Sequence, residues 1–258
     1  MTTLAWDGRR FIPAEEPAGT VRVADSWRHV DGRVRRLDLH RERFTRSVAL
    51  REPALDVAAM VDAAAGVIPA VGEWFPRVRL VGDTLYLDIR RGPCRHPSAS
   101  VRVLPKGDPR SNPLVKGPDL ALAAGLIATA RETGADEVLL RSASGRVLEA
   151  GHAAVVWWDE DALCVPSAGL PVLPSVTRRL VEERARGLGL EVRRVSAELS
   201  DLDGCEAWLL NAYQGLRLVT AWLGEDTITP GVGRRFQSWR AALDAALDPV
   251  GNRRPAHG

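Results

Sequence analysis

The sequence predicts an α+β fold with two domains, a small N-terminal domain over residues 1–104 and a larger C-terminal domain over residues 114–258. The first hundred residues combine short alternating segments with one helical stretch, whereas the later part places several strand-like segments between two helical patterns. Between them, "PKGDPRSNP" contains three prolines and a glycine, a composition that continues neither a helix nor a central strand. We therefore expect an interdomain linker over residues 105–113.

The N-terminal part carries both kinds of pattern. Residues 85–92 ("LYLDIRRG") and 100–105 ("SVRVLP") alternate apolar and polar side chains, as half-buried strands do. Residues 54–68 ("ALDVAAMVDAAAGVI") have the spacing of a helix. These segments predict the α and β components of the small domain.

The C-terminal part begins with a helical pattern over 117–134, in which Pro118 lies near the first turn and Gly134 ends the helix. A meander of four short strands is then expected in "EVLLRS", "RVLEA", "AAVVWW" and "ALCVP". Residues 173–190 ("LPSVTRRLVEERARGLGL") form a second helical pattern, which Ser175 or Thr177 can cap.

Composition excludes several classes of protein. Lys+Arg of 35 against Asp+Glu of 33 leaves a formal charge of +2, and the arginines are scattered among acids, so we expect no nucleic-acid partner. The chain lacks the roughly 18 uninterrupted apolar residues of a membrane span. Its three cysteines have no C-x-x-C spacing, so neither a metal site nor a disulfide framework is expected, and a cytoplasmic location fits.

Lysine is rare in this arginine-rich chain. Only Lys106 and Lys116 occur, and Lys106 reads as a solvated linker residue. Lys116, in "NPLVKGPDL", lies at the junction with the first C-terminal helix. The start of the second helix is a candidate anion site, because its backbone N–H groups, the Thr177 hydroxyl and the Arg178 charge favour a phosphate.

Taken in order, six segments resemble the class IV aminotransferase family, the fold-type IV enzymes that use pyridoxal 5′-phosphate. They are "DLHRERF", "RRGPCRH", "VKGPDL", "GADEVLLRSASGRVLEA", "LPSVTR" and "EAWLLNAYQGLRLV". The resemblance runs from about Asp31 to Trp222. It implies a small N-terminal α/β domain, a larger C-terminal domain with a barrel-like β core flanked by helices, and a homodimer.

The resemblance also implies the cofactor residues. The family's cofactor lysine matches Lys116, and its cofactor-anchoring glutamate matches Glu149, 33 positions later. In "LPSVTR", Val176 and Thr177 match the phosphate-binding positions, and Arg43 of "HRERF" matches an arginine that also meets the phosphate.

Each of these residue types suits the chemistry that the resemblance implies. An aldehyde cofactor needs a primary amine for its resting Schiff base, and the same amine can then move a proton at the substrate α-carbon. Arginine is a poor substitute, because its guanidinium stays protonated. A carboxylate beside the pyridine nitrogen keeps that nitrogen protonated, which suits Glu149.

The expected substrate residues are Arg95, His96 and Ser26. Arg95 and His96 resemble a strand-end loop that grips the substrate carboxylate in D-amino acid aminotransferases of the family, and arginine is a sound carboxylate receptor. The family's N-terminal glycine-rich segment, which lines the substrate pocket, is replaced here by "VRVADSWRHVDG". Only Ser26 falls where the family has its threonine.

Three functions follow as hypotheses. The first is transamination between an amino acid and a keto acid through a Lys116 Schiff base. The second is a lyase similar to aminodeoxychorismate lyase, which acts on an amino-chorismate-type substrate and releases pyruvate to give 4-aminobenzoate. The third is a degenerate homologue that binds a ligand without turnover, a reading that the altered N-terminal segment motivates.

Overall fold

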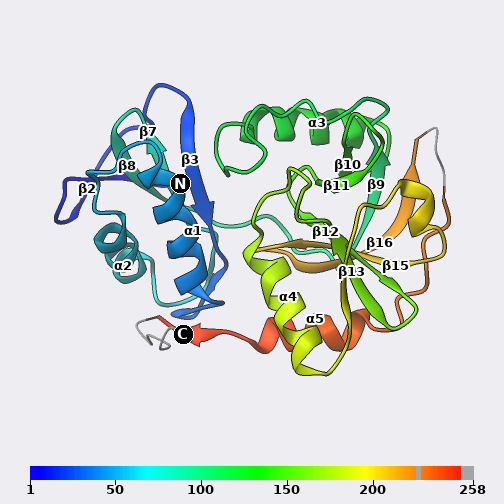
Figure 1. Ribbon diagram of the computed structural model, residues 1–258. Helices are drawn as coiled ribbons and strands as arrows, with labels where there is room; N and C mark the ends of the chain where they lie inside the picture. Colours follow the sequence, from blue (N-terminus) through cyan, green and yellow to red (C-terminus); the bar gives the residue numbers. More distant parts are fainter. Residues whose placement is uncertain (225–227, 251–258) are drawn as a thin grey trace. The chain divides into compact units, whose positions relative to one another are not determined.

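The computed structural model describes residues 1–224 and 228–250 (Figure 1). They form two compact units. The first unit contains residues 1–94, the short segment Val115–Pro118 and the C-terminal segment from Ala246 onward; the second contains Arg95–Leu114 and Asp119–Ala245. The chain therefore enters each unit more than once.

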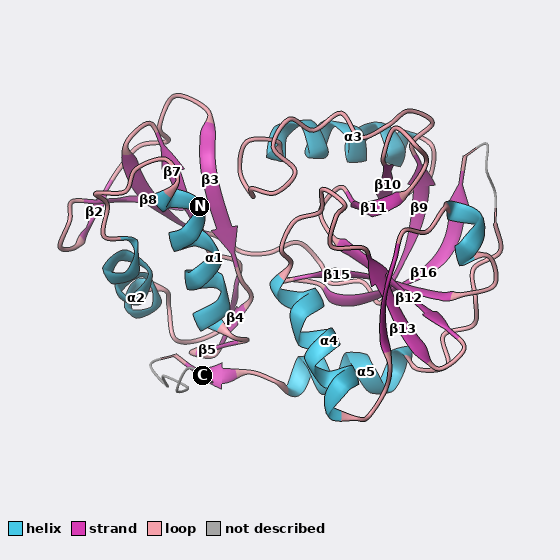
Figure 2. Cartoon of the chain, viewed as in Figure 1, coloured by secondary structure: helices cyan, strands magenta, loops and turns pink. Residues whose placement is uncertain are grey.

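The first unit is built on a five-stranded antiparallel sheet with the order β2-β1-β8-β7-β3. Strands are drawn in magenta in Figure 2. The strands of this sheet are β1 (Thr2–Trp6), β2 (Phe11–Pro13), β3 (Val21–Ser26), β7 (Arg77–Val81) and β8 (Thr84–Ile89). A small second sheet has the order β17-β5-β4-β6, made of β4 (His29–Val30), β5 (Arg33–Val34), β6 (Glu73–Trp74) and β17 (Asp248–Pro249).

Helices α1 (Leu37–Ala49) and α2 (Val57–Val67) bury one face of the larger sheet. Phe44 and Met60 of the helices pack in one core with Leu80 and Leu87 of the strands. The helix expected over 54–68 begins at Val57, because the Asp56 side chain caps it by accepting a hydrogen bond from the Ala59 N–H at 3.0 Å.

The second unit contains a curled eight-stranded sheet with the order β11-β10-β9-β16-β15-β12-β13-β14. Its strands are β9 (Ser98–Val103), β10 (Glu137–Arg141), β11 (Val147–Ala150), β12 (Ala154–Asp159), β13 (Ala162–Pro166), β14 (Val192–Val195), β15 (Glu206–Asn211) and β16 (Gly215–Leu223). The helices are α3 (Leu120–Glu132), α4 (Val176–Gly187), the 3-10 turn η1 (Leu199–Leu202) and α5 (Phe236–Ala245).

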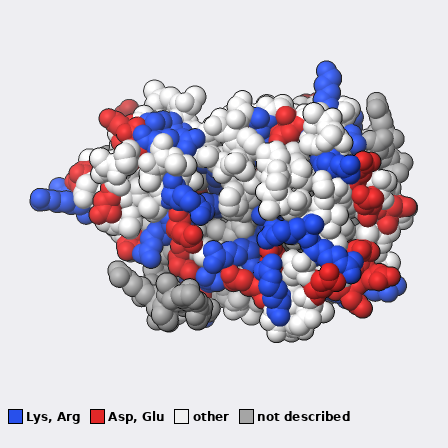
Figure 3. Space-filling view, viewed as in Figure 1, with Lys and Arg blue, Asp and Glu red and all other residues white. Residues whose placement is uncertain are grey.

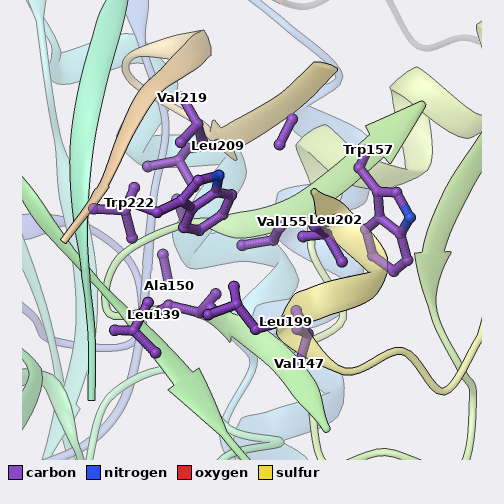
Figure 4. Close-up of a cluster of buried hydrophobic side chains, with 14 of the residues drawn as sticks. Leu139, Val147, Ala150, Val155, Trp157, Leu199, Leu202, Leu209, Val219 and Trp222 are labelled. Carbon is purple, nitrogen blue, oxygen red and sulfur yellow. The ribbon is translucent and has the colours of Figure 1, made fainter. Parts of the chain in front are cut away.

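Alternation along the strands creates two cores on the two faces of this sheet. On β12, Val155 and Trp157 join the core shown in Figure 4, where Leu209 and Trp222 also lie. Trp158, two residues on from Val156, faces α4 and α5 instead and packs with Trp208 and Trp239. A third cluster, which includes Ile127 and Val138, lies under α3.

The predicted α+β class, with helices flanking a curled β core, is confirmed. The predicted linker, residues 105–113, lies inside the second unit. Strand β9 precedes it and pairs with β10 and β16, so the hydrogen bonds of the sheet place Ser98–Val103 in this unit. Within the described residues, no helix has both the length and the apolar character needed to cross a membrane.

Candidate functional site

In the first unit, Asp25 at the end of β3 connects two residues of α1. Arg43 donates two hydrogen bonds to its carboxylate, from Nε and from an Nη, each at 2.8 Å, and His40 Nδ1 lies 2.8 Å from Asp25 Oδ1. All three side chains are buried. Burial alone would raise the pKa of the Asp25 carboxyl, but Arg43 and His40 hold it well below its usual value.

The Lys116 segment packs against β3 in the same unit. The Ala24 N–H donates to the Lys116 carbonyl at 2.6 Å, so residues 115–118 are joined to the strand through the main chain. Gly117 has a φ of 143°, and a Cβ there would lie 2.8 Å from Val23 Cα. Burial lowers the pKa of His40, and the positive charges of Arg43 and Lys116 contribute to this shift. Lys116 thus lies near the cluster of Asp25, His40 and Arg43.

Ser26 faces the opposite side of the sheet from Asp25. It is buried and lies opposite Arg77 of β7, which in turn lies opposite Asp88 of β8. Directly opposed residues share a face. Arg77 donates to Asp88 at 2.7 Å, and Arg79 donates to the other Asp88 oxygen at 2.8 Å.

Arg90, just beyond β8, belongs to the same group of arginines. Its Nε donates to the Phe75 carbonyl at 2.9 Å, and its guanidinium lies 4.4 Å from the centre of the Phe75 ring. Burial, together with the positive charges of Arg77 and Arg79, lowers the pKa of Arg90 to about 10. Among the described residues it forms no ion pair with a carboxylate.

The second unit positions Arg95 and His96 beside the β15–β16 turn and α5. Arg95 donates to Asp244 at 2.6 Å and to the Gln214 carbonyl at 3.1 Å. The His96 N–H donates to the Gln214 side chain at 2.9 Å. The guanidinium expected to receive a substrate carboxylate therefore contacts a carboxylate of its own chain.

Glu149, near the end of β11, is also buried in the second unit. Its Oε1 accepts a hydrogen bond from Arg110 at 2.5 Å and another from the Leu173 N–H at 3.0 Å. Burial raises the pKa of the Glu149 carboxyl, while the positive charges of Arg110 and Arg178 oppose that rise. The residue expected beside the cofactor ring is thus held by a guanidinium.

Arg178, in the first turn of helix α4, interacts electrostatically with the Glu149 carboxylate. Of the two possible caps, Ser175 caps the helix by accepting from the Arg178 N–H at 3.2 Å. Val176 and Thr177 are buried in the first turn, where backbone N–H groups have no partner within the helix. This arrangement suits an anion.

Several residues of these clusters were missed by sequence reasoning. Asp25 directly precedes Ser26, but nothing in "VADS" indicates that it binds Arg43, 18 positions away. Asp108 and Arg110 lie in the segment assigned to a linker, and only the tertiary fold brings Arg110 to Glu149. Arg90 is the first residue of the "RRGPCRH" segment, in which only Arg95 and His96 were given a functional assignment.

Charges of both signs are intermingled on the face of the molecule shown in Figure 3, as the balanced composition predicts. Arginine side chains commonly have an acidic partner close by, for example Arg193 beside Asp159 and Glu191. The clusters described above differ from this surface pattern because their charged groups are buried.

Solved structures show which fold this is. A hypothetical aminotransferase from Mycobacterium tuberculosis, bound to α-ketoglutarate and PMP, matches with a TM-score of 0.81 at 20% identity, covering 98% of this chain and 100% of that one. The PLP form of a branched-chain amino acid aminotransferase from Thermobaculum terrenum matches with a TM-score of 0.82 at 20% identity, covering 97% and 99%.

A third structure, the branched-chain amino acid aminotransferase of Escherichia coli, matches with a TM-score of 0.80 at 16% identity, covering 97% of this chain and 100% of that one. No curated protein matches the sequence. The family model for amino-transferase class IV matches residues 22–222, a span that includes β3, α1, Lys116, Glu149 and the start of α4. The chain therefore belongs to the class IV aminotransferase family.

Proposed function

We propose that this protein is a pyridoxal 5′-phosphate-dependent aminotransferase that moves an amino group between an amino acid and a keto acid. The family match carries the proposal, because it spans every residue assigned to the cofactor. Lys116 would hold the cofactor covalently, and Glu149 would partner its ring nitrogen. Val176, Thr177 and Arg43 would meet its phosphate.

The residues present suit this group. Lys116 is a half-buried primary amine in a chain with one other lysine. Glu149 is a buried carboxylate whose Oε2 accepts no hydrogen bond from the described residues, although its Oε1 accepts two. The first turn of α4 offers backbone N–H groups and the Thr177 hydroxyl. Arg43 meets the phosphate in this proposal while its Nε and one Nη stay on Asp25.

When bound, pyridoxal 5′-phosphate supplies an aldehyde that accepts an amino group and a ring that withdraws electrons from the substrate α-carbon. Lys116 would supply the primary amine that holds the cofactor and would also move a proton at the substrate α-carbon. An ionised Glu149 would keep a proton on the ring nitrogen, and the first turn of α4 would hold the phosphate.

The substrate side is proposed to involve Ser26, Arg95 and His96. Arg95 already donates to the Asp244 carboxylate, so a substrate carboxylate would have to displace Asp244 or share the guanidinium with it. Arg90 needs no such exchange, because it pairs with no carboxylate among the described residues. We therefore add Arg90, on the face of the sheet that carries Ser26, as a candidate carboxylate receptor.

The decisive experiment uses the two lysines as a matched pair. After incubation with pyridoxal 5′-phosphate and borohydride, peptide mapping of the wild type and of Lys106→Arg should find the pyridoxyl group on Lys116. Lys116→Arg should carry none and should lose about 10²- to 10⁴-fold in kcat. A wild-type protein without an adduct on Lys116 would overturn the proposal and leave the ligand-binding homologue.

Product analysis separates the two enzyme hypotheses. Transfer of an amino group from an amino-acid panel to a keto-acid panel supports transamination. Release of pyruvate and 4-aminobenzoate from aminodeoxychorismate without a keto acid would instead establish the lyase, which the "LLNAYQGLRLV" segment and Ser26 favour. We further propose a cytoplasmic homodimer; sedimentation of the holoenzyme at the mass of a single chain would contradict the dimer.

A further inference from the structure

Arg110 is held rigidly between two carboxylates of the second unit. It donates to Asp108 from Nε at 3.0 Å and from an Nη at 2.7 Å, and its other Nη donates to Glu149 Oε1 at 2.5 Å. The side chains are 8% exposed for Arg110, 9% for Asp108 and 6% for Glu149. A bidentate pair of this kind fixes both the position and the plane of the guanidinium.

The loop that carries Arg110 is itself fixed. The Asp108 N–H donates to the Arg141 carbonyl at 2.7 Å, which ties the loop to the end of β10. The Arg110 N–H donates back to Asp108 Oδ1 at 3.0 Å. Asp108 therefore shapes the main chain of the loop and orients the guanidinium at the same time.

The hydrogen bonds divide the two oxygens of Glu149 into different roles. Oε1 accepts hydrogen bonds from Arg110, which precedes Glu149 in the chain, and from the Leu173 N–H, which follows it. Oε2 accepts no hydrogen bond from the residues that the structure describes. The carboxylate is thus fixed through one oxygen, and the other stays available to a ligand.

Charge explains why a guanidinium is needed here. The groups that act on Glu149 are Arg110, Asp108 through its pairing with Arg110, and Arg178 of α4. Burial favours the protonated form of the Glu149 carboxyl. The positive charges of Arg110 and Arg178 and the hydrogen bonds from Arg110 and the Leu173 N–H oppose it, Arg110 most strongly. Arg110 between two carboxylates leaves the trio with one net negative charge, enough to balance one protonated ring nitrogen.

We propose that Arg110, oriented by Asp108, is a positioning residue that keeps Glu149 ionised and leaves its Oε2 available to the ring nitrogen of the cofactor. The inference rests on the proposed function for the identity of that ligand. The ionisation of Glu149 is a property of the protein alone and is measured without the cofactor.

The first test is infrared spectroscopy of the apo-protein near neutral pH. Arg110→Met should show the carbonyl band of a protonated carboxylic acid that the wild type lacks, and the band should vanish in the double variant Arg110→Met, Glu149→Gln. Arg110→Lys should restore ionisation in part, because lysine keeps the charge but not the bidentate contact with Asp108. Asp108→Asn should give no such band, because it removes a neighbouring negative charge while Arg110 keeps its positive charge.

Arg146→Met is the matched control, since Arg146 pairs with Glu198 at 3.2 Å on the surface of the same unit. It should leave the infrared spectrum unchanged. If Arg110→Met does not fold, Arg110→Lys carries the test. An identical state of Glu149 in the wild type and in every folded Arg110 variant would overturn the proposal.

The second test is cofactor binding. Arg110→Met should weaken the binding of pyridoxal 5′-phosphate by about 10- to 100-fold, the size expected for a lost interaction of a charged group. Unchanged affinity in that variant would overturn the role of Arg110. If the wild type fails to bind the cofactor while the infrared difference is present, the proposed function fails and the ionising role of Arg110 survives.

Discussion

At the scale of single residues, Asp25 holds two side chains of α1, and one of them, His40, interacts electrostatically with Lys116. Asp25 is fully buried, and its two oxygens serve Arg43 and His40. A buried charge is tolerated only with well-placed partners, so removing one member leaves the other uncompensated. Asp25 is therefore expected to matter for stability and for the site.

We expect Asp25→Asn to destabilise the protein by about 3–5 kcal/mol, because the buried Arg43 loses its ionic partner. Urea unfolding measures the change. Asp62→Asn is the control: Asp62 pairs with Arg41 at the surface at 2.9 Å, and such pairs contribute about 0–1 kcal/mol. Equal losses in the two variants would contradict the role given to Asp25.

The same carboxylate predicts a pH dependence. Its folded-state pKa lies below the unfolded value of about 3.9, so the stability it contributes is present above that pH and is lost as the pH falls. The wild type should lose stability on acidification below about pH 4, and Asp25→Asn should lose less over that range. Unfolding curves at a series of pH values test the difference.

At the scale of elements, the Lys116 segment depends on close packing against β3. Gly117 adopts a φ of 143°, and a Cβ would lie 2.8 Å from Val23 Cα and 2.9 Å from its carbonyl carbon. These are main-chain atoms, which cannot rotate away as a side chain can. The hydrogen bond between the Ala24 N–H and the Lys116 carbonyl would have to lengthen.

Gly117→Ala should therefore cost more than the strain of a positive φ alone, about 1–3 kcal/mol, and should reduce borohydride trapping at Lys116. Gly134→Ala is the matched control, because Gly134 has a φ of 81° but nothing within 4 Å of its Cβ position. It carries the backbone strain without the clash. Comparable stability and trapping in the two variants would contradict the packing argument.

The start of α4 gives a second prediction for an element. Ser175→Ala removes the cap of the helix and should cost about 0.5–2 kcal/mol. Ser175→Asp keeps the cap and places a negative charge beside the proposed phosphate site. We expect it to retain thermal stability but to weaken the binding of pyridoxal 5′-phosphate, measured by titration. Undiminished binding in Ser175→Asp would contradict a phosphate at this helix.

At the scale of the whole molecule, the first unit draws on three separate parts of the chain. After the second unit is complete, the chain returns as β17, which pairs with β5 of the first unit. The Val250 N–H donates to the Gly32 carbonyl at 2.9 Å, and Arg33 donates to the Leu247 carbonyl at 2.6 Å. The first unit is incomplete until this return.

A chain that ends after Ala245 should have a lower melting temperature than a chain that ends after Val250. The first truncation removes β17 and these hydrogen bonds, and the second retains them. If the loss is about 1 kcal/mol, the expected shift is about 2–4 °C for a protein of this size. Equal melting temperatures would show that β17 contributes nothing to stability.

Local signals predicted much of the fold. The apolar run "AAVVWW" predicts β12. In the structure Val155 and Val156 lie in different cores, because successive side chains of a strand point to opposite faces of the sheet. Ser175 was one of two caps read from the sequence, and it is the one used. Such features succeed because strand alternation and helix capping depend on residues within a few positions of each other.

Contacts between distant segments escaped prediction. Strand β9 pairs with β16, and Leu218 of β16 lies opposite Ser98 of β9. No local sequence pattern predicts pairing between strands so far apart in the chain. Arg110 reaches Glu149 across 39 positions for the same reason. Proline content marked residues 105–113 as irregular, but could not show that Asp108 and Arg110 within them are buried.

The sequence by itself determined the α+β class, the order of the elements from α3 to α4 and the resemblance that singled out Lys116 and Glu149. Local periodicity and the scarcity of lysine are properties of the chain before it folds. Only the tertiary structure decided that Asp25 holds Arg43, that Arg95 pairs with Asp244 and that Arg110 holds Glu149. Buried charges find partners wherever the fold brings opposite charge close, whatever the separation along the chain.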